Sequence, residues 1–514
     1  MSKIKQKPQP VLGADKQQIK NEFHQRVHAT LDAGREEVVA GRHAKGYRTA
    51  RENLADICDP DSFLEYGQLA VAAQRKRRDF EDLKINTAAD GIITGLATIN
   101  SDQFNDDASR VAVIVNDYTV LAGTQGFYHH KKLDRILEVI DELRLPVVMY
   151  TEGGGGRPGD TDQEVTMDVN SFASWASLRT KVPMIAVNNG YCFAGNAALF
   201  GCADITIATR SSWIGMAGPA MIEGGGMGIH EPTNIGPVDI QTSNGVIDVV
   251  AEDEREATQL ARQLLSYFQG PVDDWKCADQ DKLWDLLPED RRFVYDVRAL
   301  ITTLADTNSF IELRRNYGPG IITGFLRVEG IPFGVICNDC KILGGAIDAE
   351  ASASAARFLN LCNDFQIPVI SFCDTPGFMV GPDSEEQGAV RLMSDLFVAG
   401  AKLNSPMVAI FLRKGYGLGA IAMTGGSFSK PIYSAAWPSG EFGTMGFEGA
   451  VHLGFKKELD ATKTEAERDK LFAKLLDSMY QRGKATEAAT YLEVDAVIDP
   501  KNTRRVIIQA IQSR

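Results

Sequence analysis

This chain of 514 residues lacks an excess of positive charge and lacks long apolar runs. Its formal net charge of -14 at pH 7 argues against a nucleic-acid-binding protein, because phosphate contacts need clustered Lys and Arg side chains. The longest apolar stretches are strand-sized, so no membrane span is expected. The N-terminus, MSKIKQKPQP, is polar without an apolar signal core, and the first arginine is Arg26. We therefore expect a cytoplasmic protein that binds neither nucleic acid nor membrane.

Histidine and cysteine are also scarce, with seven and eight residues respectively. His24 and His28 have HxxxH spacing but lack the Glu that follows the first His of a zinc-protease helix, so we expect them on a solvated helix face. Cys337 and Cys340 form one CxxC, and no second pair follows at zinc-finger spacing. We expect reduced cysteines, no metal in this chain, and a chemistry that does not depend on an imidazole.

The length exceeds what one hydrophobic core usually supports, so two or more domains are expected. Residues 15–51 are rich in charge with apolar residues at helical spacing, which predicts one or two surface helices. A basic run follows at Arg75, Lys76, Arg77 and Arg78. We favour a solvated face for this run, and the alternative is an anion site that grips a phosphorylated ligand.

Five segments of the first half recur in the second half in the same order, which indicates two copies of one domain. Gly91–Gly95 and Gly320–Gly324 share the letters GIITG at an offset of 320 − 91 = 229. The other matches are Val113–Asp117 with Val335–Asp339, Gly123 with Gly345, and Leu145–Val148 with Ile367–Ile370, all at 222, and Val182–Val187 with Ser405–Ile410 at 223.

Each copy alternates short apolar strands with helices and glycine turns, which predicts an α/β fold with mostly parallel strands. We place the domains at 1–270 and 271–514, with the junction at Ala257–Gln269 and the Gly270-Pro271 that follows. The helices expected within the copies are Phe127–Leu143, Ala349–Asn363 and Val390–Lys402. Beyond the second copy we expect a charged helix at Lys456–Gln481, a short strand and turn at Val494–Pro500 and a closing helix at Arg504–Gln512.

Glycine turns follow the strands at two places in each copy. In the second copy, the sequence predicts a strand at Met407–Leu412, a turn at Gly415, Gly417 and Gly419, and a helix opening at Ala420–Met423. The other second-copy turn is Asp374–Gly377, and the first-copy turns are Glu152–Gly159 and Gly190–Gly195. Each half therefore offers two backbone corners on one sheet edge, and a pair of N–H groups from such corners can hold a thioester oxygen as it becomes an enolate.

The sequence resembles the carboxyltransferase subunit of biotin-dependent acyl-CoA carboxylases of the acetyl- and propionyl-CoA type. The resemblance covers roughly residues 20–512 and implies an internal duplication of two crotonase-like (ClpP/crotonase) domains. The motifs that carry it are Asp374–Gly381 (DTPGFMVG), Ala351–Phe365, Trp437-Pro438, Met445–Val451 (MGFEGAV), Val494–Arg505 and Ser243–Glu254.

The resemblance also implies the roles of individual residues. The first-half corner, at Ala194 and Gly195, would stabilise the acyl-CoA enolate, and the second-half corner, with Gly419 as its surest member, would hold the ureido oxygen of biotin. Matching the two halves pairs Ala194-Gly195 with Gly419-Ala420, whereas a gapless match to the family points to Leu418-Gly419. Ala194 stands where the family usually has glycine, which costs nothing if its φ is ordinary. The expected substrate-binding residues are Gly153, Gly154, Gly155, Gly156, Tyr191, Phe193, Gly377, Phe378, Gly417, Leu418, Ile421 and Ala422, with Ile421 at a position that influences acyl-chain choice.

The implied reaction is carboxyl transfer from N-carboxybiotin to the α-carbon of an acyl-CoA. No biotin-accepting AMKM motif and no ATP-binding glycine loop is present, so the resemblance implies a biotin carboxylase and a biotin carboxyl carrier protein, or one fused subunit, as partners. It also implies a homo-oligomer, a hexamer, in which the first half of one subunit faces the second half of another.

Three alternatives stay open at this point. A decarboxylase subunit would run the transfer in reverse, and a non-catalytic scaffold would keep only the fold. A CoA hydratase or isomerase would need a carboxylate pair, for which Glu223 and Glu231 are the nearest candidates.

Overall fold

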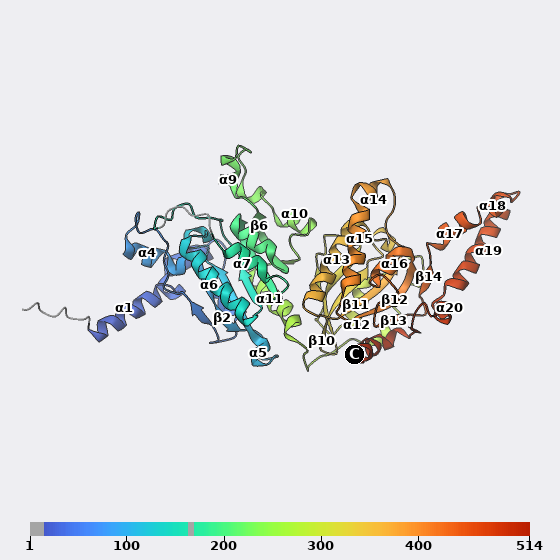
Figure 1. Cartoon of the computed structure of the whole chain (residues 1–514), viewed down its shortest axis with the longest axis horizontal. Helices are drawn as coiled ribbons and strands as arrows, with labels where there is room; N and C mark the ends of the chain where they lie inside the picture. The colour runs from blue at the N-terminus through green and yellow to red at the C-terminus, as the bar shows by residue number, and fades with distance from the viewer. Residues whose placement is uncertain (1–14, 163–168, 514) are drawn as a thin grey trace, which may run out of the picture.

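The computed structural model describes residues 15–162 and 169–513 and contains two sheets, one in each half of the chain (Figure 1). The first sheet has the order β1-β2-β3-β4-β5-β6-β7, and the second β15-β13-β12-β11-β10-β9-β8, with β14 paired to β12. The first-sheet strands are β1 (Leu64–Tyr66), β2 (Ile92–Thr98), β3 (Arg110–Asn116), β4 (Val147–Tyr150), β5 (Met184–Phe193), β6 (Ile205–Gly215) and β7 (Val249–Ala251). The second-sheet strands are β8 (Ile311–Leu313), β9 (Ile321–Val328), β10 (Ile331–Asn338), β11 (Val369–Thr375), β12 (Met407–Tyr416), β13 (Tyr433–Ala436), β14 (Glu441–Gly443) and β15 (Ala496–Val497).

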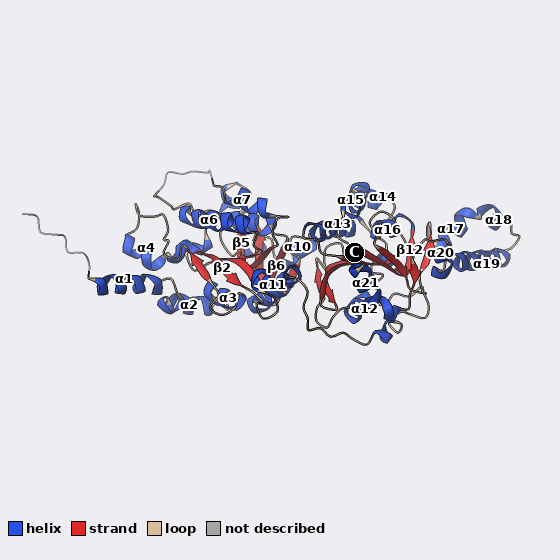
Figure 2. Cartoon of the chain, turned by 60° about the horizontal axis from the view of Figure 1, so that its bottom comes forward, coloured by secondary structure: helices blue, strands red, loops and turns tan. Residues whose placement is uncertain are grey.

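Helices cover both faces of each sheet (Figure 2). The first-half helices are α1 (Lys16–His28), α2 (Glu36–His43), α3 (Ala50–Ile57), α4 (Phe80–Asn86), α5 (Asp106–Ser109), α6 (Phe127–Leu143), α7 (Ser171–Leu178), α8 (Gly195–Cys202), α9 (Pro219–Gly224), α10 (Val238–Ser243) and α11 (Glu254–Gln269). The second-half helices are α12 (Val297–Leu304), α13 (Ala349–Asp364), α14 (Pro382–Glu386), α15 (Ala389–Lys402), α16 (Gly417–Met423), α17 (Phe447–Gly454), α18 (Lys456–Asp460), α19 (Glu465–Gly483), α20 (Ala485–Thr490) and α21 (Thr503–Gln512).

The central strands are buried on both faces, which is why they read as unbroken apolar runs. In β3, Val111, Val113 and Val115 pack into the cluster that includes α3 and α11, and Ala112 and Ile114 pack on the opposite side against α6 and α7. Strands β3 to β7 form one run of parallel strands, and β10 to β13 form another. The β1–β2, β2–β3, β8–β9 and β9–β10 pairs are antiparallel. The prediction of an α/β fold with mostly parallel strands is confirmed.

The two halves repeat the same backbone details, which explains why particular letters recur. Gly95 and Gly324 hold equivalent positions in β2 and β9, and a methyl at either would collide with a carbonyl oxygen of the neighbouring edge strand. Gly123 and Gly345 both have positive φ. A methyl at Gly123 would lie 2.7 Å from the Glu152 carbonyl oxygen, and one at Gly345 2.5 Å from that of Asp374. Glu152 and Asp374 are also separated by 374 − 152 = 222 residues. The two turns therefore pack on the ends of equivalent strands, β4 and β11.

The segment predicted as the junction is the helix α11, and it packs against both halves. The Phe268 ring lies 5.3 Å from Phe365 and 5.6 Å from Phe325, and one apolar cluster runs from α3 and α11 into α13 and α15. A buried ion pair also crosses between the halves, with Arg314 Nη1 2.6 Å from Asp248 Oδ1. One hydrophobic cluster is therefore continuous between the halves, and each half also has a separate cluster of its own.

Two predicted elements differ from the structure. The charged segment Lys456–Gln481 is two helices, α18 and α19, because Thr464 caps a new helix by accepting a hydrogen bond from the Glu467 N–H. The strand β12 runs four residues past the predicted end at Leu412, and α16 begins at Gly417 instead of Ala420.

The remaining helix predictions agree closely with the structure. The helix Phe127–Leu143 is confirmed residue for residue, and the helices predicted at Ala349–Asn363, Val390–Lys402 and Arg504–Gln512 are each longer by one residue at one end. Residues 15–51 form α1 and α2 and enter α3, and α1 buries none of its side chains.

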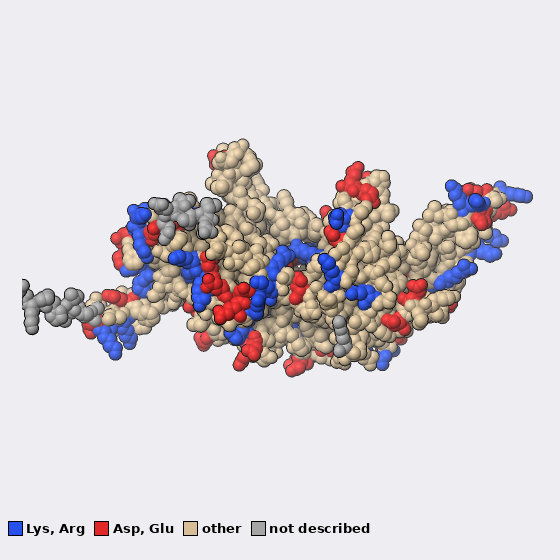
Figure 3. All heavy atoms as spheres, in the orientation of Figure 1, with Lys and Arg blue, Asp and Glu red and all other residues tan. Residues whose placement is uncertain are grey.

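Charged side chains of both signs are interspersed over the face shown in Figure 3, with Lys and Arg following a line across the middle of the molecule. The basic run at 75–78 is engaged with neighbouring oxygens, since Arg75 lies 3.6 Å from Asp162, Arg77 donates to the Gly159 carbonyl, and Arg78 pairs with Asp82 at 2.6 Å. Among the described residues no helix combines the length and apolarity that crossing a membrane requires.

Candidate functional site

The second-half corner is built where two parallel strands, β11 and β12, end side by side. After β11 the chain turns at Gly377, whose φ is +123°. The Thr375 hydroxyl oxygen accepts from the Gly377 N–H at 3.1 Å, the Ile347 N–H donates to the Gly377 carbonyl at 3.0 Å, and the Met379 N–H donates to the Ile347 carbonyl at 2.8 Å. The amide between them, that of Phe378, has no acceptor among the described residues.

The helix α16 starts at once after β12 because Gly417, with φ +57°, turns the chain directly from strand into helix. Its first amides have no intrahelical partner, and they carry the positive end of the helix dipole. Gly419 packs against the other turn, since a methyl there would lie 2.8 Å from the Gly377 Cα and 3.1 Å from the Phe378 nitrogen. The first turn of α16 and the unpaired Phe378 amide are therefore neighbours.

The first-half corner repeats this arrangement. Gly155 has φ +87°, its carbonyl accepts from the Gln125 N–H at 2.7 Å, and the Arg157 N–H donates to the Gln125 carbonyl at 2.8 Å. The Gly156 amide between them has no acceptor among the described residues. Gly195 opens α8 in the same way that α16 opens, and its amide is likewise unpaired within the described chain.

These contacts give a direct alignment of the two corners and correct the pairing made from the sequence halves. A methyl at Gly155 would lie 3.2 Å from the Phe193 carbonyl oxygen, and one at Gly377 3.7 Å from that of Tyr416. Phe193 and Tyr416 also end their strands. The equivalent residues are thus Ala194 with Gly417, Gly195 with Leu418, and Asn196 with Gly419. The sequence match of Ala194-Gly195 with Gly419-Ala420 is therefore displaced by two residues, and the structural alignment gives Gly417-Leu418, one residue before the Leu418-Gly419 alternative.

Ala194 does not have the ordinary φ that the sequence argument assumed. Its φ is +50° and its ψ −118°, a region that favours glycine. Its N–H donates to the Gly215 carbonyl at 3.0 Å, so the free donor of this corner is Gly195. Ala420 is fully buried one position beyond Gly419. Ala194 and Ala420 therefore support the corners, and Gly195 and Leu418 present the amides.

Several of the residues expected to bind substrate hold the first corner together. The amides of Gly153 and Gly154 donate to the carbonyls of Tyr191 and Ala122, and the Gly155 amide donates to the Asn196 side chain at 3.0 Å. The Phe193 N–H donates back to the Gly153 carbonyl at 2.9 Å, and the Tyr191 ring stacks on the Phe193 ring at 5.6 Å. Of these four glycines, Gly156 alone keeps a free amide in the described part of the chain.

Carboxylates anchor the strand ends behind both corners. Glu152 forms a buried ion pair with Arg42, and Asp374 pairs with Arg413 at 2.9 Å. Burial raises the pKa of Glu152 to about 7, against the opposing effect of Arg42. The offset of 222 marks the two carboxylates as equivalent, although sequence reasoning did not identify this role.

A pocket of about 750 Å³ opens beside the second-half corner and is lined by second-half residues. Gly417, Leu418 and Ile421 line it, together with Phe442 and Tyr491 from later in the chain. Ile421 lines the pocket, whereas Ala422 is fully buried in the core. Sequence reasoning missed the buried amide side chains of Gln125 and Asn196 at the first corner.

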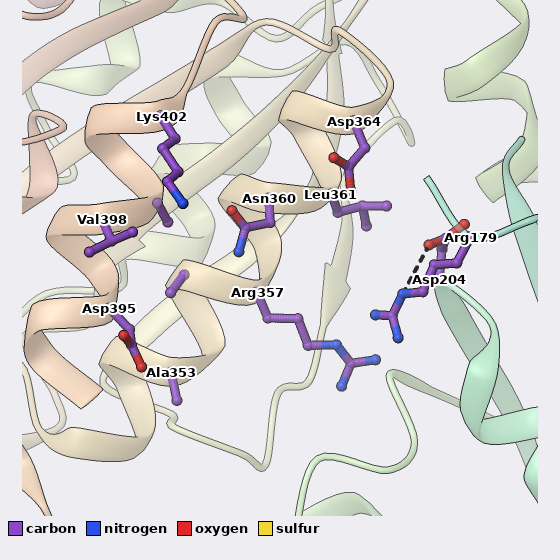
Figure 4. A pocket seen from close by; sticks show the side chains of 12 residues that line it. Arg179, Asp204, Ala353, Arg357, Asn360, Leu361, Asp364, Asp395, Val398 and Lys402 are labelled. Atoms are coloured by element: carbon purple, nitrogen blue, oxygen red, sulfur yellow. Dashed lines mark ion pairs between the residues drawn. The ribbon is translucent and has the colours of Figure 1, made fainter. Parts of the chain in front are cut away.

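A second pocket lies between the halves of the chain and contains none of the expected site residues (Figure 4). The first half contributes Arg179 and Asp204, which are 3.6 Å apart, and α13 and α15 contribute Arg357, Asp364 and Lys402 among others. Within one chain, this cleft does not bring the two corners together.

Two other predictions concern residues outside the corners: the carboxylate pair that a hydratase would need, and the cysteines of the CxxC. Glu223 and Glu231 are exposed, on α9 and just beyond it, and α9 projects away from the sheet in Figure 1. They are not poised over a buried acyl chain as a hydratase would require. Cys340 is buried and its Sγ accepts from the Tyr295 N–H at 3.4 Å.

Comparison with known proteins gives consistent matches over the whole chain. The carboxyl transferase domain family matches residues 41–514. The methylmalonyl-CoA carboxyltransferase 12S subunit of Propionibacterium freudenreichii subsp. shermanii is 31% identical over 93% of this chain and 91% of its own length. The biotin-dependent long chain acyl-coenzyme A carboxylase beta4 subunit of Mycobacterium tuberculosis is 30% identical over 97% of this chain and 94% of its own length.

Solved structures give the same result. A single-chain, multi-domain long-chain acyl-CoA carboxylase is 52% identical with a TM-score of 0.92, covering 96% of this chain and 48% of that protein, so the chain spans about half of its length. The hexameric transcarboxylase 12S with methylmalonyl-coenzyme A bound is 28% identical with a TM-score of 0.85, covering 98% of this chain and 96% of that one.

Proposed function

Because the chain belongs to the carboxyl transferase domain family, we propose that its two corners hold the two substrates of carboxyl transfer from biotin to the α-carbon of an acyl-CoA. The protein is the carboxyltransferase component of a biotin-dependent acyl-CoA carboxylase, an enzyme with two crotonase-like halves. The observation that carries the proposal is the recurrence, in each half, of two backbone amides without an acceptor among the described residues, Gly156 with Gly195 and Phe378 with Leu418. Preorganised amides of this kind stabilise an oxyanion without a titrating side chain.

The first-half pair, Gly156 and Gly195, holds the thioester oxygen as it gains charge. The second-half pair, Phe378 and Leu418 with Gly419 beside them, holds the ureido oxygen of biotin. The α8 and α16 dipoles add partial positive charge at each oxygen. Ala194 and Ala420 support the starts of the two helices. Of the four residues named from the sequence, Gly195 provides a donor amide itself, and Gly419 lies next to the donor amide of Leu418.

The residues around the second corner fit biotin. The pocket beside the corner has apolar and aromatic side chains on part of its wall, among them Leu418, Ile421 and Phe442, that can contact an uncharged ring system. The Phe378 and Leu418 amides, which have no acceptor among the described residues, provide donors for its one strongly polar oxygen. When bound, carboxylated biotin supplies the carboxyl group and, after giving it up, the base that takes the α-proton of the acyl-CoA. The chain itself polarises both oxygens with its amides.

We further propose that the acyl-CoA carries a long chain. The 52% identical solved structure and the 30% identical Mycobacterium tuberculosis protein both act on long-chain acyl-CoA by name.

The assembly is proposed from the same relatives. The carboxyltransferase 12S relative is a hexamer, and we propose a homo-hexamer here, with the first half of one subunit facing the second half of another. A biotin carboxylase and a biotin carrier, as separate chains or as further domains, complete the enzyme. We propose the cytoplasm as its location and residue 270 as the boundary of the two domains, because Gly270 ends α11 with φ +121°.

The test is ATP-dependent fixation of labelled bicarbonate by the chain with its biotin-bearing partners, across acyl-CoA substrates from acetyl to palmitoyl. The proposal predicts label in the acyl-CoA product, with the highest kcat/KM for long chains. Turnover that favours acetyl-CoA would refute the chain length alone, and no label with any acyl-CoA would refute the carboxylase assignment.

A further inference from the structure

The Arg157 side chain follows directly after the Gly156 amide and is almost fully buried. Its exposed fraction is 4%, whereas Gly156 itself is exposed at the corner. One guanidinium nitrogen, Nη1, lies 2.5 Å from Oδ1 of the fully buried Asp90, and the other, Nη2, donates to the Thr124 carbonyl at 2.7 Å. The guanidinium therefore ties the residue after the proposed oxyanion donor to segments 67 and 33 positions earlier in the chain.

The backbone and the side chain of Arg157 hold the same neighbouring segment. The Arg157 N–H donates to the Gln125 carbonyl at 2.8 Å, while Nη2 donates to the carbonyl of the residue before it, Thr124. A methyl at Gly126 would collide with Nη1, so the guanidinium packs directly on the main chain there. Arg157 is thus fixed at both its backbone and its side-chain end.

The backbone before Arg157 has little to fix its own direction. Four consecutive glycines, Gly153–Gly156, precede Arg157, and glycine has more backbone freedom than any other residue. The first three of these amides are held by hydrogen bonds of their own, whereas the Gly156 amide has no acceptor among the described residues. The direction of the Gly156 N–H is therefore set by its neighbours, and Arg157 is the neighbour that carries a side chain.

The second-half corner has no ion pair at the equivalent positions. Met379 stands in place of Arg157, and the offset of 229 places Pro319 in place of Asp90. That turn also contains a single glycine, Gly377, against four in the first half. The ionic clamp therefore belongs to the corner with the less restricted backbone.

We propose that Arg157 is a positioning residue for carboxyl transfer, and that its clamp on Asp90 and Thr124 directs the Gly156 N–H toward the thioester oxygen. This inference rests on the proposed function, which assigns that oxygen to the Gly156 and Gly195 amides. A preorganised donor acts on the charge that develops in the transition state more than on the bound substrate. Loss of the Arg157 side chain should therefore lower kcat more than it raises KM.

Fixation of labelled bicarbonate by the complete enzyme would compare the wild type with Arg157→Lys and Arg157→Met. Lys keeps a positive charge near Asp90 but lacks the fork that reaches both Asp90 and Thr124, and Met removes both contacts. The expected kcat falls in that order, by about tenfold or more for Arg157→Met, within the limit of about 10²- to 10³-fold for losing one donor. The KM for the acyl-CoA should change by less than about threefold.

The infrared carbonyl stretch of a bound thioester separates positioning of the donor from a general loss of stability. Palmitoyl-CoA labelled with ¹³C at the thioester carbon reports how strongly the corner polarises that carbonyl. At saturating ligand, the stretch in the wild type should lie below that of free palmitoyl-CoA. In Arg157→Met it should move back toward the free value, with Arg157→Lys between the two.

Arg504→Met is the matched control. Arg504 is 6% exposed, lies 2.7 Å from Asp306 Oδ1 and donates to the Leu304 carbonyl at 2.7 Å, on a helix that contributes to neither corner. Its substitution should leave kcat and the carbonyl stretch unchanged.

Wild-type kcat and stretch in a folded Arg157→Met variant, or equal changes in Arg157→Met and Arg504→Met, would overturn the inference while leaving the proposed function intact. If Arg157→Met does not fold, Arg157→Lys decides by the same two measurements. A wild-type enzyme that fixes no label with any acyl-CoA would instead refute the proposed function.

Discussion

Gly419 packs its Cα directly on the backbone of Gly377, so that a side chain at 419 would lie 2.7 Å from the Gly377 carbonyl carbon. The helix α16 and the turn after β11 can meet only because residue 419 is glycine. Gly419→Val should therefore force the two unpaired amides of the second corner apart. We expect carboxyl transfer to fall by about 10²- to 10³-fold, the cost of losing one oxyanion donor, with acyl-CoA binding largely retained.

Initial rates of labelled bicarbonate fixation and acyl-CoA titration would measure the two effects of Gly419→Val. Gly449→Ala is a suitable control, because a methyl at Gly449 would meet no atom within 4 Å. Wild-type turnover by a folded Gly419→Val variant would contradict the assignment of this corner.

The first-corner amide can be removed directly by Gly156→Pro, which deletes the N–H. Gly156→Ala keeps the N–H, and its methyl would meet no protein atom within 4 Å. We expect Gly156→Pro to lower kcat by about 10²- to 10³-fold and Gly156→Ala to have a much smaller effect. Steady-state kinetics, with thermal unfolding as a check on folding, would show the difference. Similar rates for the two variants would mean that the Gly156 amide is not an oxyanion donor.

Ala194 holds a conformation that suits glycine, with φ +50°. Strain of this kind costs on the order of 1–3 kcal/mol, which exceeds the entropic cost of glycine in the unfolded chain. Ala194→Gly should therefore raise the free energy of unfolding by roughly 1 kcal/mol. Ala198→Gly, inside α8, should lower it by about the same amount. Urea unfolding would test the opposite signs, and destabilisation by Ala194→Gly would disprove the strain.

The carboxyl group of Asp204 links stability to pH at the junction of the halves. Burial raises its pKa to about 7, with Arg179 at 3.6 Å opposing and Asp364 reinforcing the shift. A raised pKa contributes stability that is fully present below the unfolded pKa of about 4 and is lost as pH rises through about 7. Asp204→Asn should be more stable than the wild type at pH 8, by up to a few kcal/mol, with the advantage falling to roughly 1 kcal/mol at pH 5. Unfolding midpoints at both pH values would test this, and parallel pH profiles would refute it.

Local patterns were sufficient to predict most of the helices and strands. The apolar spacing of Phe127–Leu143 and the proline at 146 fix a helix that the structure reproduces to the residue, because both signals act within a few residues. Internal matching found the duplication, because Gly95 and Gly324, like Gly123 and Gly345, meet the same backbone in each copy.

The details of the corners depend on conformations that the letters leave open. A run of three glycines does not say which one turns the chain, and the +57° φ of Gly417 places the start of α16 three residues before the predicted start. The engagement of the Ala194 amide by Gly215 and the burial of Asn196 arise from contacts between distant segments. Sequence reasoning therefore located the corners but not the donors within them.

The central claim is that carboxyl transfer joins the first-half corner of one subunit to the second-half corner of another. Co-assembly of Gly156→Pro subunits with Gly419→Val subunits tests it, because each variant retains the corner that the other has lost. The account predicts that neither variant alone fixes labelled bicarbonate at an appreciable rate and that mixed oligomers recover a substantial part of the wild-type rate. Mixed oligomers as inactive as the separate variants would contradict it.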